Sequence, residues 1–84
     1  MNTIPPRLRW ACRRGMLELD VLLNKFLEGA YLQLTNTDQA TFMALLECSD
    51  QDLFLWLTGQ SKPSEPVLAQ MVDQIISYAR QSNR

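Results

Sequence analysis

Apolar residues along this chain recur mostly every three or four positions, which is the spacing of one face of an α-helix. The pattern is clearest near the C-terminus, in the series Val67, Leu68, Met71, Val72, Ile75, Ile76 and Ala79. Pro66 just before this series suits the first turn of a helix, and Ser64 is placed to cap it. The sequence therefore predicts a long amphipathic helix at this end of the chain.

A second long helix is predicted from Met16 to Tyr31. Its apolar stripe consists of Leu19, Leu22, Leu23, Phe26 and Ala30. Glu18 and Asp20 fall in its first turn, where the positive end of the helix dipole favours acidic side chains. Leu17 and Val21 lie on the opposite, polar face. Two interpretations of this pair stay open: contact area for a partner, or cover for another helix.

Three shorter helices complete the pattern. One spans Asp38 to Glu47, with Asn36 or Thr37 as its cap. The apolar run at 53–57 is compatible with a buried strand, but the preceding Ser49 and its acidic neighbours are typical of a helix N-terminus, and Gly59 suits the C-terminal end. The first helix covers residues 6–14, because proline is tolerated at its start and nothing interrupts it before the next glycine.

These elements define an all-α protein, and we expect a compact five-helix antiparallel bundle. The chain has 84 residues, of which 46% are hydrophobic and 20% charged. That composition is typical of a folded globular protein, and the length suits one core, so residues 1–84 are predicted to form a single domain.

The sequence lacks the residues that most catalytic mechanisms use. The chain contains no histidine, which is the commonest general base and metal ligand. Cys12 and Cys48 match no metal-ligand spacing, and no glycine-rich phosphate loop follows a strand. An acidic group near Glu47, Asp50 and Asp52 is better explained as a solvated helix junction than as a metal site. We therefore expect no catalytic residues, no metal and no stably bound cofactor, and conclude that the protein is not an enzyme.

Other classes are disfavoured by the same composition. Two cysteines are too few for a disulfide-framed secreted protein, and the apolar runs are too short for membrane insertion. The net charge is −1 and the pI is about 5.2, although a basic pole is formed by Arg7, Arg9, Arg13 and Arg14. Proteins that bind nucleic acid usually carry a clear basic excess. A nucleic-acid-binding module is thus a weak alternative, and a soluble protein of a reducing compartment is expected.

The segment around Gly15 is the strongest candidate site. Glu18 follows Arg14 by four positions, so the two would present opposite charges beside a residue without a side chain, which suits docking of a partner. Trp10 lies among the arginines, a setting for cation–π contact. Each feature also has an ordinary explanation: Gly15 as a helix cap, the charges as a surface ion pair, and Trp10 as a packed aromatic.

The flanking residues strengthen the docking interpretation. The run is Arg9-Trp10-Ala11-Cys12-Arg13-Arg14-Gly15-Met16-Leu17-Glu18-Leu19-Asp20. It resembles the signature of the succinate dehydrogenase flavinylation (FAD assembly) factor family, and the resemblance continues in register to Pro63. In bacteria this family has also been described as the antitoxin of a toxin–antitoxin pair.

The resemblance implies a compact five-helix fold and a function as an assembly factor. Members bind the flavoprotein subunit of succinate dehydrogenase, and in bacteria that of fumarate reductase, and promote covalent attachment of FAD to a histidine of that partner. FAD would thus be carried by the partner. Carried over by position, the core contact residues would be Arg14, Gly15 and Glu18. Further contact residues would be Arg7, Trp10, Met16 and Asp20.

On this interpretation the protein is a cytoplasmic monomer that acts by protein–protein interaction, without nucleic acid. The alternative is an antitoxin-type regulatory protein that binds a toxin or a cytoskeletal partner. It would use the same surface, so the residues alone do not separate the two functions.

Overall fold

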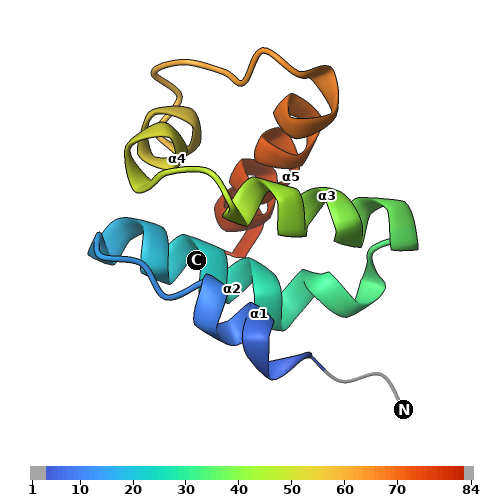
Figure 1. Ribbon diagram of the computed structural model, residues 1–84. Coiled ribbons are helices and arrows are strands. Elements are labelled where there is room, and N and C mark those ends of the chain that lie inside the picture. The colour runs from blue at the N-terminus through green and yellow to red at the C-terminus, as the bar shows by residue number, and fades with distance from the viewer. Residues whose placement is uncertain (1–3, 83–84) are drawn as a thin grey trace.

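Five α-helices and one short 3₁₀ turn make up the computed structural model, which describes residues 4–82 (Figure 1). The elements are α1 (Pro6–Ala11), α2 (Leu17–Ala30), η1 (Tyr31–Gln33), α3 (Asn36–Leu46), α4 (Asp50–Leu57) and α5 (Pro66–Ser82). No strand occurs among the described residues. The prediction of an all-α protein with five helices is therefore confirmed, and residues 53–57 belong to a helix rather than a strand.

Local side-chain chemistry sets the beginnings and ends of the middle helices. Ser49 Oγ accepts a hydrogen bond from the Asp52 N–H at 3.1 Å, which starts α4 as predicted. Gly59 follows α4 with a φ of 84°, the left-handed conformation that glycine adopts at helix ends. At α3 the predicted caps were wrong, because Thr35 Oγ1 accepts from the Asp38 N–H at 3.1 Å.

The first helix is shorter than predicted. It ends at Ala11 with Cys12 as its C-cap, instead of continuing to Arg14. The Ala11 carbonyl accepts a hydrogen bond from the Arg14 guanidinium at 3.0 Å, so a side chain takes the place of a helical amide. Asn24 Nδ2 of α2 donates to the Cys12 carbonyl at 3.2 Å and ties this end of α1 to its neighbour. The chain then crosses to α2 through a short irregular connection.

The core lies where α5 packs against α2, α3 and α4 (Figure 1). Its aromatic centre joins Phe26 of α2 to Phe42 of α3 at 5.4 Å between ring centroids, and to Tyr78 of α5 at 5.7 Å, edge to face. Leu8 of α1 and its C-cap residue Cys12 also belong to the core, with exposures of 2% and 0%. Burying a leucine contributes roughly 1.5–3 kcal/mol, so Leu8 before the connection and Leu19 after it anchor α1 and α2 to the core.

Candidate functional site: a docking surface at the α1–α2 connection

The guanidinium of Arg14 is directed into the protein. Its nitrogens donate to three backbone carbonyls, at 3.0 Å to Ala11, 2.8 Å to Leu46 and 2.8 Å to Cys48. The side chain is only 14% exposed. Arg14 thereby joins the last carbonyls of α1 and α3, which have no partners within their own helices. The expectation that Arg14 presents its charge to a partner does not agree with this geometry.

Asp50, the first residue of α4, completes the same arrangement. Its Oδ1 lies 3.0 Å from Arg14 Nε, an ion pair that is close but not aligned as a hydrogen bond. Its Oδ2 accepts a hydrogen bond from the Gly15 N–H at 3.3 Å. The sequence assigned Asp50 to a solvated acidic junction and missed this function. The helix dipole alone explains an acidic residue at a helix N-terminus. The sequence therefore gave no reason to expect that Asp50 pairs with a distant arginine.

Gly15 is exposed, and the fold does not require a glycine at this position. Its φ is not in the left-handed region, where Gly59 is the only described residue. A Cβ built on Gly15 would meet only Asp50 Oδ2, at 3.6 Å, which is ordinary van der Waals contact. The helix-cap interpretation therefore does not apply, because α1 ends earlier, at Ala11, with Cys12 as its C-cap. Neither a positive φ nor a close packing contact within the described residues therefore accounts for a glycine here.

Glu18 stands one residue inside α2 with its carboxylate exposed. It forms no ion pair with any residue between 4 and 82. In particular, it does not pair with Arg14, whose charge is used inside the protein. The predicted pair of opposite charges thus becomes a single outward carboxylate beside Gly15.

Three large apolar side chains of α1 and α2 are exposed. Trp10 is 72% exposed, Leu17 76% and Val21 49%. The guanidinium of Arg13 lies 5.7 Å from the centre of the Trp10 ring, so the expected cation–π contact is present. Leu17 and Val21 are thus exposed rather than buried beneath another helix. We call the exposed residues of this region the Gly15 surface: Trp10, Arg13, Gly15, Leu17, Glu18 and Val21.

Two of the remaining predicted contact residues are less accessible to a partner. Met16 is partly buried against the core, and Asp20 Oδ1 accepts a hydrogen bond from Asn24 Nδ2 at 2.7 Å. Arg7 is exposed. Arg9 forms an ion pair with Glu28 at 2.8 Å, so the basic pole predicted for this segment is partly neutralised within the protein.

Both thiols are disfavoured as nucleophiles. Burial raises the pKa of Cys12 from 9.0 to about 11, opposed in part by the Arg14 charge. Burial also raises the pKa of Cys48, and the Asp52 carboxylate contributes in the same direction. A thiol with a raised pKa is protonated at neutral pH and reacts slowly. Within residues 4–82 no group of three or more His, Cys, Asp or Glu side chains is arranged to hold a metal ion.

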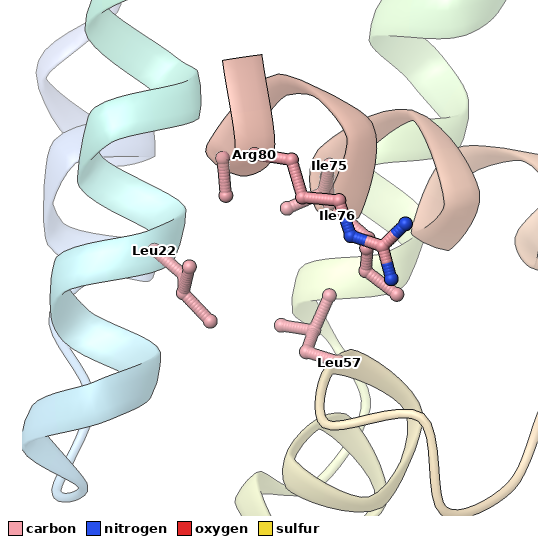
Figure 2. Close-up of a pocket in the computed structure, with 6 residues that line it drawn as sticks. Leu22, Leu57, Ile75, Ile76 and Arg80 are labelled. Atoms are coloured by element: carbon pink, nitrogen blue, oxygen red, sulfur yellow. The ribbon is translucent and has the colours of Figure 1, made fainter. Parts of the chain in front are cut away.

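An apolar pocket lies between α2, α4 and α5 (Figure 2). It is lined by Leu22, Leu57, Ile75, Ile76, Ala79 and Arg80. In Figure 2 the Leu22 side chain points from α2 across the pocket toward Ile76 and Leu57. Its volume of about 170 Å³ is below the range of about 300–1,000 Å³ usual for ligand sites. This pocket is therefore small and lined mainly by aliphatic side chains.

The described residues form a small all-α protein with exposed apolar and charged side chains near the connection between α1 and α2. None of its described helices is long and apolar enough to cross a membrane. Residues 6–79 match the family described as "Flavinator of succinate dehydrogenase". The chain belongs to this family.

Similar proteins from several bacteria carry the name FAD assembly factor SdhE. The protein from Shewanella oneidensis is 51% identical over 69 residues, which cover 82% of this chain and 84% of that protein. The one from Vibrio cholerae is 49% identical over 72 residues, covering 86% and 84%. The one from Aliivibrio fischeri is 46% identical over 72 residues, with the same coverage. The resemblance inferred from residues 9–20 is thereby confirmed.

Proposed function

We propose that this protein is an assembly factor that binds the flavoprotein subunit of succinate dehydrogenase and promotes its covalent flavinylation. The family description and the names of the relatives support this function. One observation on this chain carries it: Gly15 is exposed, lies beside an unpaired carboxylate and has no conformational or packing reason to be glycine. Such a position is expected where the backbone of another protein approaches closely.

The proposed mechanism is positioning rather than chemistry by this chain. The partner supplies the acceptor histidine and carries the FAD, so the assembly factor needs no catalytic group and no bound cofactor of its own. Docking would hold the flavin-binding regions of the apo-subunit in the arrangement that favours bond formation. Proximity and orientation of this kind can lower a barrier by several kcal/mol. Release follows because the factor binds the immature state better than the flavinylated one.

Each part of the Gly15 surface has a physical task in this mechanism. Gly15 lets the partner backbone come close, and Glu18 meets a basic or hydrogen-bond-donating group across the interface. Trp10 and Leu17 are large exposed side chains of the kind that anchor interfaces. Arg7 is a peripheral contact in this scheme. Met16 and Asp20 support the surface from within rather than touch the partner.

We further propose that the factor acts as a monomer in the cytoplasm and also serves the flavoprotein subunit of fumarate reductase. The same surface logic would apply to both partners, because the two reactions attach the same cofactor. The antitoxin alternative is not favoured, since the relatives reported above are named for FAD assembly.

Covalent flavin can be read directly in a denaturing gel by its fluorescence. The flavoprotein subunit would be expressed in a strain that lacks its own assembly factor, with and without this chain. We expect strong fluorescence of the subunit band only when the chain is present, and co-purification of the two proteins. Equal fluorescence in both cultures would refute the proposed function.

A further inference from the structure

Five polar contacts converge where the ends of α1, α3 and α4 meet. The Arg14 guanidinium donates to three carbonyls there, those of Ala11, Leu46 and Cys48. Asp50 supplies the other two contacts, with Oδ1 at 3.0 Å from Arg14 Nε and Oδ2 at 3.3 Å from the Gly15 nitrogen. We call this set the Arg14–Asp50 junction. It joins residues that are far apart in the sequence directly behind the Gly15 surface.

The two oxygens of Asp50 act on consecutive residues of the connection. One oxygen holds the side chain of Arg14, and the other holds the backbone of Gly15. The side chains of Arg14 and Asp50 are 14% and 34% exposed, so their attraction is screened less by water than that of a surface pair. The backbone amide of Gly15 is therefore held from α4, in addition to the packing and the Asn24 hydrogen bond that anchor α1 and α2 on either side of it.

We propose that Asp50 is a positioning residue for partner binding: it acts through Arg14 and the Gly15 amide, and does not itself contact the partner. Arg14 has the same positioning function within the Arg14–Asp50 junction. This explains why its charged side chain points into the protein although its backbone lies next to the Gly15 surface. The inference rests on the proposed function, because the surface being positioned is the one that binds the flavoprotein subunit. Its physical basis is preorganisation, which lowers the ordering cost of binding.

Asp52 provides a matched control. It lies in the same first turn of α4 and carries the same charge, so it interacts with the helix dipole as Asp50 does. Its side chain is exposed and forms no ion pair within residues 4–82. Asp50→Asn and Asp52→Asn therefore remove the same charge from the same helix end, and only the first breaks the junction.

The test measures binding of the full chain to the apo-flavoprotein subunit of succinate dehydrogenase, at a temperature where circular dichroism shows each variant fully folded. We expect Asp50→Asn to raise the Kd by about ten-fold, and Asp52→Asn to leave it unchanged. The effects of Arg14→Gln and Asp50→Asn should be non-additive, because both break one junction. Glu18→Gln and Asp50→Asn should combine additively.

Hydrogen exchange of the Gly15 amide supplies a second readout that does not depend on the partner. We expect faster exchange at Gly15 in Asp50→Asn and wild-type exchange in Asp52→Asn. A Kd for Asp50→Asn equal to that of wild type, or equal losses in both variants, would overturn the inference. If the wild-type chain did not bind the subunit at all, the proposed function would fail, and unchanged Gly15 exchange in Asp50→Asn would then decide against the junction as well.

Discussion

The phenol of Tyr78 on α5 occupies the space that a side chain at Gly29 of α2 would need. A Cβ built on Gly29 would overlap the Tyr78 hydroxyl and lie 2.7 Å from its Cζ. The same ring packs edge to face against Phe26, at 5.7 Å between centroids. Gly29 thus lets α5 pack closely on α2, which explains a glycine inside a helix despite its low helix propensity.

Gly29→Ala is expected to destabilise the protein. The added methyl group forces the Tyr78 ring off Phe26, and overpacking of this kind costs about 1–3 kcal/mol. Replacing a helical glycine by alanine returns about 1 kcal/mol, so the net loss is smaller than the clash alone. Urea denaturation followed by circular dichroism measures the change. Gly15→Ala is the control, because its Cβ meets nothing closer than 3.6 Å. A Gly29→Ala variant as stable as wild type would contradict the packing argument.

Graded substitution at Gly15 separates binding from folding. Gly15→Ala and Gly15→Leu should both unfold at nearly the wild-type urea concentration, since the site is exposed and its φ is ordinary. Covalent flavinylation of the flavoprotein subunit should fall with side-chain size and be absent with leucine, because the partner backbone is held off. In-gel flavin fluorescence in a strain lacking the wild-type factor measures this. Normal flavinylation by the folded Gly15→Leu chain would show that the partner does not dock at this residue.

Exposed apolar area on α2 gives an independent prediction. Leu17→Gln should change the free energy of unfolding by no more than about 0.5 kcal/mol, since Leu17 is 76% exposed. It should weaken the complex with the flavoprotein subunit by about 1–2 kcal/mol, the range of an interface anchor. Val67→Gln is the control, because Val67 is 56% exposed at the beginning of α5, outside the Gly15 surface. Isothermal titration calorimetry measures both, and equal losses in affinity would remove Leu17 from the interface.

The positions of the helices could be predicted because the apolar side chains of the core recur at regular helical spacing. The stripe on α5 and that on α2 follow from periodicity alone, and Ser49 marks the start of α4 through a local hydrogen bond. The end of α1 was not predictable in this way. It depends on Arg14 donating to the Ala11 carbonyl, and a side chain that reaches back to a carbonyl leaves no trace in hydrophobic spacing.

The sequence located the candidate surface but left its exposure open. Trp10, Leu17 and Val21 could each have packed against another helix, and the structure shows all three exposed. The predicted outward orientation of the Arg14 side chain was wrong. Its three acceptors are backbone carbonyls, and these cannot be recognised from the sequence because every residue has one. Asp50 was missed because its partner lies in another helix connection, and a long-range pair has no spacing rule.

The buried thiol of Cys12 makes the stability of the protein depend on alkaline pH. The pKa of this thiol is raised from its ordinary value of 9.0 to about 11 in the folded state, chiefly by burial. Between those two values the unfolded chain binds fewer protons than the folded one, so stability falls as pH rises. The contribution is fully present below pH 9 and is lost as pH passes 11. Stability falls by at most about 1.4 kcal/mol for each pH unit crossed between the two pKa values.

Urea unfolding at several pH values from 8 to 11 checks this, with Cys12→Ala for comparison. The variant loses packing at all pH values, so the slope of stability against pH is compared rather than its level. We expect a shallower decline for Cys12→Ala, because Cys48 and the other titrating groups remain in both proteins and contribute equally. Parallel curves would mean that Cys12 ionises alike in the folded and unfolded states, contrary to its complete burial in the core.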